Sequence, residues 1–260
     1  MKIAVITGAS SGIGQELARA IDKIEPLDEM WIISRRRERL EAFAKTLRTP
    51  ARILALDLSS PTALEEYGTL LEKENPDIST LGNVSGFGKF ALFEETPLKD
   101  LMGMVDVNDR AYIAMARMSL PYMHRGSRIF NVASQAAFQP LPYECIYGAS
   151  KAFVLSFSRA LNVELEPRGI RSMAICPGWV KTEFFETAVL KPPAVTYYNS
   201  WVTPEEVVER ALSDYNRGRD VSIPNPQVRS LVRLAKILDH KQVMRIWMHQ
   251  QKHDNRPPIN

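Results

Sequence analysis

Short apolar segments alternate along this chain with longer amphipathic segments, and this alternation limits the fold more than any other feature. The apolar segments are unbroken and rich in β-branched residues, as expected of strands buried on both faces. Alternating strands and helices form a parallel sheet with helices on both sides. We therefore expect a Rossmann-type, doubly wound α/β fold of about seven strands. The predicted strands are residues 3–6, 30–33, 52–56, 78–84, 128–132, 171–175 and 220–223.

The segments between these strands have the pattern of helices, and some of their ends can be placed. A helix that begins near Tyr147 should end near Glu166, because Pro167 follows. Another should begin after Thr203, whose hydroxyl can cap a helix that opens with a proline and two acids. Further helices are expected at residues 15–22, 38–47, 61–74 and 98–122.

The composition agrees with one large α/β domain and excludes several other classes of protein. The 260 residues are 45% hydrophobic and 24% charged, the balance of a globular protein in water. Apolar runs are far shorter than the ~18 residues that a membrane span needs. The first run leads into a glycine-rich loop and not into a signal-peptide cleavage site, so we expect a cytoplasmic protein. The two cysteines and four histidines lack the spacing of a disulfide framework or a metal site, and no metal is expected.

A glycine-rich loop joins the first predicted strand to the first predicted helix. Residues 7–14 read Thr-Gly-Ala-Ser-Ser-Gly-Ile-Gly. Glycines at this junction let the backbone approach a pyrophosphate, and the helix N-terminus offers free N–H groups to it. The same residues could form nothing more than a tight connection, but their context favours nucleotide binding. The expected contacts are Gly8, Ser10, Ser11, Gly12, Ile13 and Gly14.

The end of the second predicted strand indicates which nicotinamide cofactor is used. An acidic residue there would bind the ribose of NAD, but the chain has Ser34, Arg35 and Arg36 instead. A guanidinium can bind the 2′-phosphate of NADP with two hydrogen bonds. The alternative is a solvated helix start, paired with Glu38 and Glu41. We predict NADP in preference to NAD.

Tyr147 and Lys151 stand four residues apart and share one face of a predicted helix. The pKa of an ordinary tyrosine is too high for efficient proton transfer near neutral pH. A nearby ammonium favours the phenolate and lowers that pKa. In isolation such a pair would be an ordinary surface feature.

Together with the glycine loop, this pair resembles the short-chain dehydrogenase/reductase family, in its single-domain branch. The resemblance covers residues 3–224 and includes Ser134, which lies thirteen residues before Tyr147. Asn108 matches the family's catalytic asparagine, and residues 177–182 match the segment that touches the nicotinamide. Further cofactor contacts that the resemblance implies are Asp57, Leu58, Asn83, Gly86, Tyr147, Lys151, Pro177, Gly178, Val180 and Thr182.

The resemblance implies a role for each of four catalytic residues. Ser134 would orient the substrate carbonyl, and Tyr147 would donate or accept the proton. Lys151 would hold the ribose and lower the pKa of the tyrosine, and Asn108 would position a water that relays protons. One motif departs from the family, because Val84 stands where an asparagine is usual. The loss of its side-chain hydrogen bonds puts the rigidity of that turn, and the affinity for cofactor, in question.

Residues 183–203 correspond to the family's mobile substrate loop. Such an apolar lid favours an apolar or aromatic substrate, although its rings could simply pack on one another. The expected substrate-binding residues are Ser134, Tyr143, Tyr147, Phe184 and Phe185. The apolar loop residues are Phe184, Phe185, Val189, Leu190, Val195, Tyr197, Tyr198 and Trp201.

The net charge of +3 is concentrated near the C-terminus. The rest of the chain is slightly acidic and gives no charge reason to bind nucleic acid. We divide the chain into an oxidoreductase domain, residues 1–226, and a basic amphipathic helical extension, residues 227–260, with a bend near Asp239. The extension could complete the core or an oligomer interface, rest on an anionic membrane, or close over an apolar substrate. Its basic residues are Arg229, Arg233, Lys236, Lys241, Arg245 and Lys252.

These features predict an NADP-dependent oxidoreductase, such as a carbonyl reductase, that moves a hydride between the cofactor and a ketone, aldehyde or secondary alcohol. The resemblance also implies a homodimer or homotetramer. Two alternatives remain: a nucleotide-sensing regulator that keeps the fold without turnover, and a peripheral membrane protein that acts through its basic tail. The set of Asn108, Ser134, Tyr147 and Lys151 favours the enzyme, because a sensor does not need it.

Overall fold

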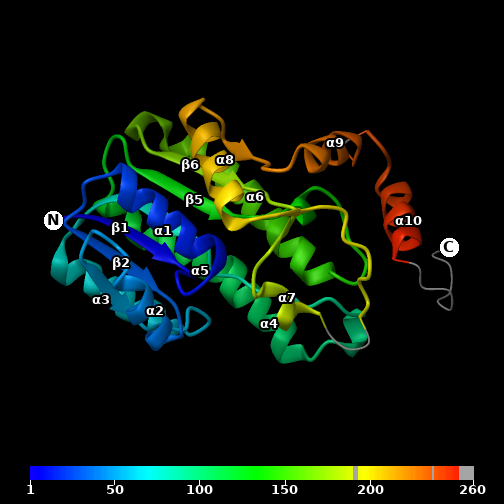
Figure 1. The fold of residues 1–260 in the computed structure, drawn as a ribbon, viewed down its shortest axis with the longest axis horizontal. Coiled ribbons are helices and arrows are strands. Elements are labelled where there is room, and N and C mark those ends of the chain that lie inside the picture. The colour runs from blue at the N-terminus through cyan, green and yellow to red at the C-terminus, as the bar shows by residue number, and fades with distance from the viewer. Residues whose placement is uncertain (190–192, 236, 252–260) are drawn as a thin grey trace.

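A computed structural model describes residues 1–189, 193–235 and 237–251 of the chain. Its centre is a seven-stranded parallel sheet with strand order β3-β2-β1-β4-β5-β6-β9, seen in Figure 1. The predicted doubly wound α/β fold is confirmed. Each predicted strand is present, with small shifts of its ends. The strands are β1 Lys2–Thr7, β2 Glu29–Ile33, β3 Ala51–Leu54, β4 Asp77–Asn83, β5 Arg128–Val132, β6 Arg171–Ile175 and β9 Val221–Ser222.

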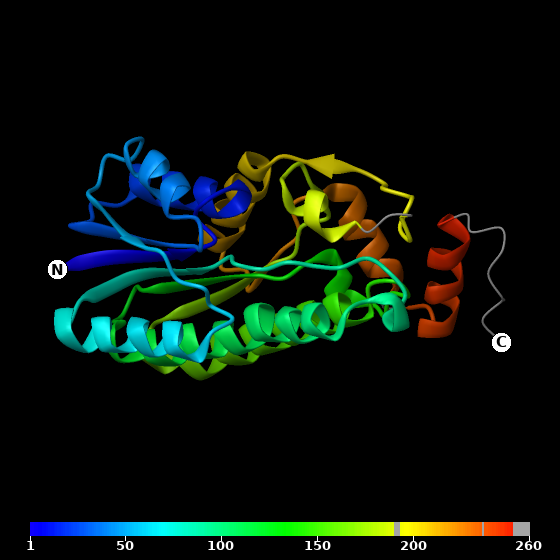
Figure 2. The same cartoon turned by 90° about the horizontal axis from the view of Figure 1, so that it is seen from below.

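Helices cover both faces of the sheet, and Figure 2 shows them as two layers with the strands between. Strand β1 explains why the sequence pattern is unbroken. Ile3 and Val5 point into the core on one face of the sheet, whereas Ala4 and Ile6 point into the core on the other face. Because both faces are buried, alternate residues have no solvent to face, and all of them are apolar.

The helices follow the predicted segments closely. Thr203 caps α8 as expected, and Glu206 completes a capping box with it. The long segment predicted at residues 98–122 is continuous but contains a π-helical turn, η2, at Asp106–Arg110. The α-helices are α1 Gly12–Ile24, α2 Arg37–Ala44, α3 Pro61–Glu74, α4 Leu98–Val105, α5 Ala111–Ser119, α6 Cys145–Leu165, α7 Phe184–Ala188, α8 Pro204–Asn216, α9 Pro226–Ala235 and α10 His240–Gln250. The 3-10 turns are η1 Phe93–Glu95, η3 Leu120–Tyr122, η4 Gln135–Phe138 and η5 Glu166–Arg168.

Three short elements were not predicted, and they lie together in the substrate loop and before it. Strands β7, Trp179–Val180, and β8, Trp201–Val202, pair in parallel, and α7 lies between them in the sequence. Two-residue strands have no periodicity that a sequence pattern could reveal.

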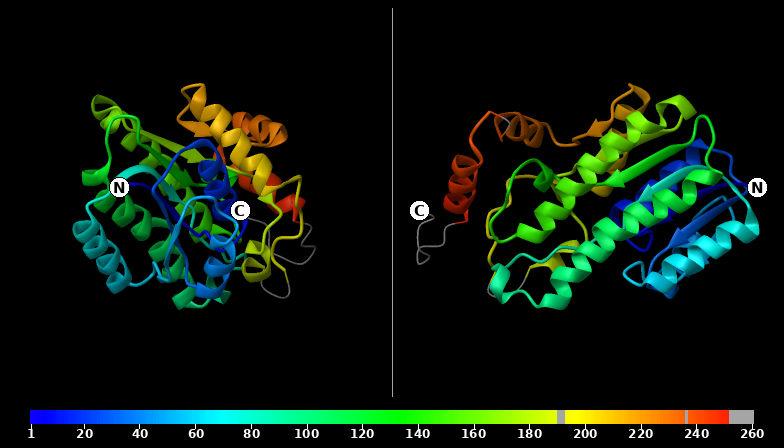
Figure 3. Two further views of the ribbon diagram at one scale, coloured as in Figure 1. Left: turned by 60° about the vertical axis from the view of Figure 1, so that its left-hand side comes forward. Right: turned by 180° about the vertical axis from the view of Figure 1, so that it is seen from behind.

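Within the described residues, the C-terminal extension contains α9 and α10, and the side chain of Asp239 between them caps α10. The predicted bend is therefore confirmed. Figure 3 shows α10 at the end of the molecule opposite the N-terminus, beyond the sheet. Leu190, Lys236 and Lys252 of the predicted loop and tail lie outside the described residues. Within the described ranges, no helix has the length and apolar character needed to cross a membrane.

Candidate active site

A cavity of about 570 Å³ opens at the carboxyl ends of the strands, where doubly wound sheets bind their ligands. Most of the predicted site residues line it. Asn83, Asn108 and Tyr143 are buried behind the wall and are not among the described residues that line the cavity. The predicted residues that line it are Gly8, Ser10, Ser11, Gly12, Ile13, Gly14, Ser34, Arg35, Arg36, Asp57, Leu58, Gly86, Ser134, Tyr147, Lys151, Pro177, Gly178, Val180, Thr182, Phe184 and Phe185.

The glycine loop has the conformation and the close packing that a pyrophosphate site requires. Gly8 and Gly12 adopt positive φ, at 68° and 54°, which side chains disfavour. A Cβ on Gly14 would lie 2.2 Å from the main-chain oxygen of Gly8, so no other residue fits there. The loop opens directly into α1, whose first N–H groups have no intrahelical partner. The residues present therefore fit a dinucleotide phosphate at this helix N-terminus.

An arginine from the end of β2 reaches across to the glycine loop. Arg36 donates to Ser10 Oγ from Nε at 3.2 Å and from Nη2 at 2.9 Å, and to Ser11 Oγ at 3.0 Å. Arg35 is exposed and makes no hydrogen bond or ion pair with the part of the chain that the structure describes. Of the two predicted arginines, Arg36 is therefore the one that joins the second strand to the loop.

Two further charged residues complete this cluster, and neither was predicted. Glu183 accepts from Arg36 at 2.8 Å and from Arg39 at 2.6 Å, and the pairing holds the pKa of its carboxyl below the usual value. Arg39 stands one helical turn after Arg36, a spacing that could have suggested it. Glu183 lies far away in the sequence, so no local pattern pointed to it.

The turn that contains Val84 is held by residues other than the missing asparagine. Thr7 Oγ1 accepts from the backbone nitrogens of Val84 and Ser85 at 2.9 and 3.0 Å. Asn83 donates to Asn131 Oδ1 at 2.9 Å, which ties β4 to β5. The side chain of Val84 packs against the core beneath α1. Val84 therefore exchanges side-chain hydrogen bonds for apolar contact, and the backbone of the turn stays fixed.

Lys151 lies beside Tyr147, but in a buried environment. Its Nζ is 5.9 Å from the centroid of the Tyr147 ring and donates to the main-chain oxygen of Val132 at 2.9 Å. Burial lowers the pKa of Lys151 to about 8, and the nearby Asp109 carboxylate acts in the opposite direction. The ammonium is therefore largely charged at neutral pH and becomes neutral in mildly alkaline solution.

The pKa of Tyr147 does not follow the prediction from its spacing to Lys151. Burial raises this pKa above its ordinary value, a hydrogen bond with Ser134 lowers it, and the carboxyl of Glu144 raises it further. The expected lowering by Lys151 is thus not found, because the loss of hydration outweighs the favourable contacts. The hydroxyl is therefore protonated at neutral pH, as a proton donor must be, but its raised pKa makes it a weaker acid than an ordinary tyrosine.

Asn108 lies in the π-helical turn between α4 and α5 and is completely buried. Its Nδ2 donates to the Phe87 oxygen and to Ser150 Oγ, each at 3.0 Å, and its Oδ1 accepts from the Phe87 nitrogen at 3.1 Å. A Cβ on Gly86 would lie 3.0 Å from Asn108 Oδ1 and 3.3 Å from Lys151 Nζ. Asn108 therefore fixes the segment after β4 against α6, next to Lys151. Such π-turns are frequent at functional sites.

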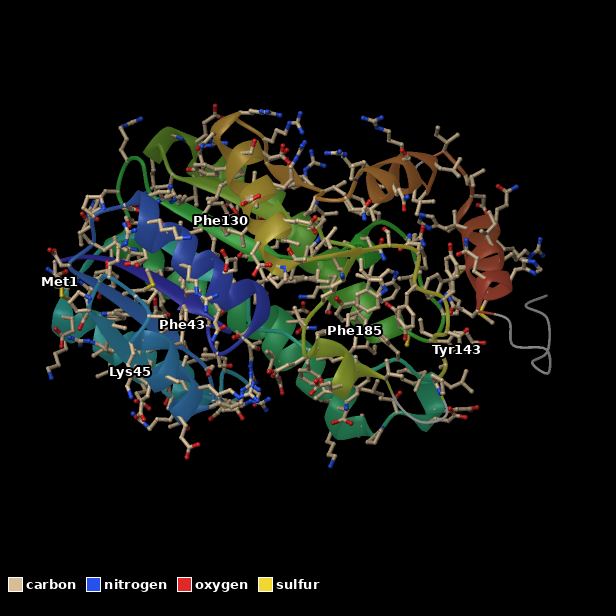
Figure 4. The ribbon with its side chains drawn as sticks, in the orientation of Figure 1. Met1, Phe43, Lys45, Phe130, Tyr143 and Phe185 are labelled. Carbon is tan, nitrogen blue, oxygen red and sulfur yellow. The ribbon has the colours of Figure 1, made fainter. Side chains whose placement is uncertain are left out.

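Aromatic rings lie around Tyr147 in the wall of the cavity. The ring of Phe184 lies 5.6 Å and that of Phe90 5.7 Å from the ring of Tyr147, measured between centroids. Phe185 packs on Trp179 at 5.6 Å. Figure 4 shows Phe185 and Tyr143 in the half of the molecule that carries α7 and α10. Tyr143, with a φ of 71°, packs in this cluster. Rings of the predicted loop thus form the cavity wall and also pack on one another.

Helix α10 closes the far end of this apolar region. Trp247 is buried in the aromatic cluster and donates from Nε1 to the main-chain oxygen of Pro142 at 3.0 Å. The buried Gln251 accepts from the backbone nitrogens of Thr196 and Tyr197 at 2.8 and 3.1 Å. The extension therefore anchors the substrate loop, a contact that the sequence pattern left open. Extension residues on the cavity include Leu231, Leu234, Leu238 and Ile246.

Comparison with known proteins assigns the family. The family model described as short chain dehydrogenase matches residues 2–192, and the chain belongs to the short-chain dehydrogenase/reductase family. It is similar to the NADP-dependent 3-hydroxy acid dehydrogenase of Salmonella typhi, with 32% identity over 80% of this chain and 86% of the relative.

Two solved structures share both the fold and about a quarter of the sequence. The short-chain dehydrogenase from Sphingobium yanoikuyae in complex with NADPH is 27% identical, with a TM-score of 0.78 over 99% of each chain. The bulky-bulky ketone specific alcohol dehydrogenase from Comamonas testosteroni is 26% identical, with a TM-score of 0.74 over 99% of this chain and 97% of that one. The protein is thus an oxidoreductase of alcohols and carbonyl compounds that uses a nicotinamide cofactor.

Proposed function

We propose that the protein is an NADP-dependent carbonyl reductase or alcohol dehydrogenase that acts on apolar ketones, aldehydes or secondary alcohols. One observation carries this proposal. Tyr147, next to Lys151, lines together with Ser134 a cavity that joins the glycine loop at one end to an aromatic wall at the other. A nucleotide-sensing regulator would not need a proton donor at that junction.

The chain's own residues bind, orient and transfer a proton. When bound, the nicotinamide cofactor supplies or accepts the hydride. Ser134 orients the carbonyl oxygen, and Tyr147 donates its phenolic proton to that oxygen in reduction or removes it in oxidation. Lys151 binds the ribose and, while charged, stabilises the phenolate that remains. Asn108 acts as a positioning residue, since its amide holds the 86–87 segment and α6 together.

The preference for NADP rests on the arginine cluster. Arg36 follows β2 and lies against Ser10 and Ser11 of the glycine loop. In this fold the adenosine ribose of a dinucleotide lies at the end of the second strand. No carboxylate follows β2 directly to repel a 2′-phosphate. The Salmonella typhi relative is named as NADP-dependent and the Sphingobium yanoikuyae structure holds NADPH, which supports the same choice. Cofactor contacts are proposed for the predicted residues that line the cavity.

The aromatic wall supports a bulky apolar substrate. Phe184 and Phe90 stand against Tyr147, and α9 and α10 add aliphatic residues to the rim. Burial of apolar substrate surface on these groups stabilises the complex in proportion to the area covered. The ketone-specific relative from Comamonas testosteroni is consistent with this class of substrate.

The extension, residues 227–260, is proposed to act with the catalytic domain, residues 1–226, as the wall that covers the substrate. Its anchors are Trp247 and Gln251. We place the protein in the cytoplasm, as expected from the sequence.

A screen of cofactors and substrates tests the proposed function. Aromatic and aliphatic ketones, aldehydes and the matching alcohols are each mixed with NADPH, NADH or their oxidised forms, and the nicotinamide absorbance is followed. We expect turnover with bulky apolar carbonyls and a higher kcat/KM with NADPH. A complete lack of turnover in a protein that binds NADPH would favour the regulator.

A further inference from the structure

A carboxyl group that the proposed reaction does not use lies in the wall of the substrate cavity. Glu144 is at the N-cap position of α6, three residues before Tyr147, makes no capping hydrogen bond with its side chain, and is only 2% exposed. Its main-chain oxygen accepts from Gly148 at 2.7 Å, and its nitrogen donates to Leu141 at 3.1 Å. The backbone is thus held on both sides, and the residue lines the cavity.

One oxygen of this carboxyl lacks a partner. Glu144 Oε1 is buried and makes no hydrogen bond to any residue in the described ranges. Buried polar atoms in folded proteins nearly always have a hydrogen-bond partner, and an exception calls for an explanation. An apolar side chain of this size would fill the same space without the cost of desolvation.

Aromatic side chains lie near Glu144, and within the described ranges its carboxyl makes no salt bridge with a cation. The titratable groups that sense its charge are the hydroxyls of Tyr147 and Tyr198, and the pKa of each is raised by it. Burial alone raises the pKa of Glu144 to about 8. The carboxyl therefore lies close enough to the catalytic hydroxyl to influence its pKa. At neutral pH the carboxyl keeps its proton.

We propose that Glu144 is a substrate-binding residue that accepts a hydrogen bond from a hydroxyl or ammonium group next to the reacting carbon. This inference rests on the proposed function and narrows its substrate class. The preferred substrates are ketones or alcohols with an apolar body and one hydrogen-bond donor on the neighbouring carbon. A site with a buried polar group rejects analogues that lack the matching group far more strongly than an apolar site rejects a missing methylene.

The test compares acetophenone with its α-hydroxy and α-amino derivatives in the full-length enzyme with NADPH. We expect the wild type to prefer at least one derivative by roughly tenfold or more in kcat/KM. Glu144→Leu should abolish that preference, because it removes the acceptor and keeps the volume. Glu144→Gln should keep a hydroxyl preference, through its amide oxygen, and should lose any preference for the ammonium derivative.

A matched control and a check of folding separate the possible outcomes. Glu164→Gln changes an exposed glutamate on the same helix, and it should leave the ratio between substrates unaltered. NADPH binding, followed by fluorescence, shows that each variant is folded. The inference is overturned if the wild type has no preference, or if Glu144→Leu keeps the wild-type preference. Should Glu144→Leu not fold, the inference is overturned if Glu144→Gln keeps the wild-type ratio of kcat/KM between the ammonium and the hydroxyl derivative. If no ketone at all is reduced, the proposed function itself fails.

Discussion

Arg36 donates two hydrogen bonds to the hydroxyl oxygen of Ser10, at 3.2 Å and 2.9 Å, and so connects the end of β2 to the glycine loop. If this guanidinium binds a 2′-phosphate, Arg36→Ala should lower kcat/KM with NADPH by roughly 10–150-fold, the value of a charge-assisted hydrogen bond. The same change should leave kcat/KM with NADH within a few-fold. Arg35→Ala is the matched control, since Arg35 is exposed, and should have a smaller effect. Equal use of both cofactors by the wild type would refute the assignment.

Replacement of Tyr147 by phenylalanine removes only the hydroxyl. We expect kcat to fall by ~10²–10⁴-fold, because the variant lacks the positioned general acid. The aromatic ring still fills the space beside Phe184 and Phe90, so the affinity for NADPH, measured by fluorescence titration, should stay within a few-fold of the wild type. More than about a tenth of wild-type kcat in the variant would show that another group transfers the proton.

The pH dependence of the reaction should report on Lys151. Its pKa is lowered to about 8 by burial, so the lysine is charged below that pH and neutral above it. In the direction of reduction, kcat/KM should therefore decline above pH 8, by about tenfold for each further unit as one proton is lost.

Lys151→Met serves as the comparison for this profile, because it keeps the length of the side chain without the charge. Its activity should be low at every pH and should lack the decline near pH 8. An unchanged decline in the variant would assign that limb of the profile to a different group.

The outer faces of α5 and α6 should form an interface between copies of the chain. Ala114, Met118 and Phe157 on these helices pack partly against the core, whereas Phe153 is 37% exposed and stacks on Phe157. Ile113 adds a further exposed apolar side chain.

Light scattering at micromolar concentration should give the mass of a homodimer or homotetramer, because burial of these apolar groups favours association. Phe153→Glu should shift the equilibrium towards monomer. Ile24→Glu, an exposed apolar residue at the end of α1 in the opposite helix layer, should not. A wild type that is monomeric at that concentration would exclude the interface.

The exposed face of the extension offers a test of membrane contact. Leu231, Leu234 and Ile237 are exposed on or just after α9, and Arg233 lies among them, whereas Trp247 is buried against the cavity. We expect weak binding to anionic vesicles that declines as salt rises. Arg233→Glu with Arg245→Glu should reduce it while the kcat/KM for ketones stays within a few-fold.

Removal of residues after Pro226 should abolish vesicle binding and also impair turnover, since it removes the anchors Trp247 and Gln251. Vesicle sedimentation and the ketone assay measure the two effects separately. Intact protein that ignores anionic vesicles at low salt would exclude the membrane contact, and full activity in the truncated chain would exclude the role of the extension in the cavity wall.

The sheet and its helices could be predicted because their signals are local and repeated. An unbroken apolar strand such as β1 or a capped helix start such as Thr203 is visible within a few residues. That the glycine loop and Arg36 line one cavity was also predictable, since both follow strands at fixed spacing, whereas the preference for NADP stays a prediction. In contrast, β7 and β8 are too short to carry a pattern, and their pairing depends on contacts across the substrate loop.

Long-range packing determined the features that the sequence could not reveal. The pairing of Glu183 with Arg39 joins residues far apart in the chain, and the burial of Glu144 depends on what covers the start of α6. The same reason explains the expectation that failed for the pKa of Tyr147. The spacing between Tyr147 and Lys151 predicted that a charge lies near the hydroxyl. The pKa of Tyr147 is dominated by burial, and burial is a property of the whole fold.

The carboxylate of Glu183 serves Arg36 and Arg39 as an internal counter-ion. Two guanidinium groups beside a glycine loop would otherwise attract any polyanion by long-range electrostatics. With one carboxylate between them, this trio of side chains carries a single net positive charge, and part of the long-range attraction is cancelled. If this end of the cavity binds a ribose phosphate, as proposed, its selectivity then depends more on shape and hydrogen-bond geometry than on charge.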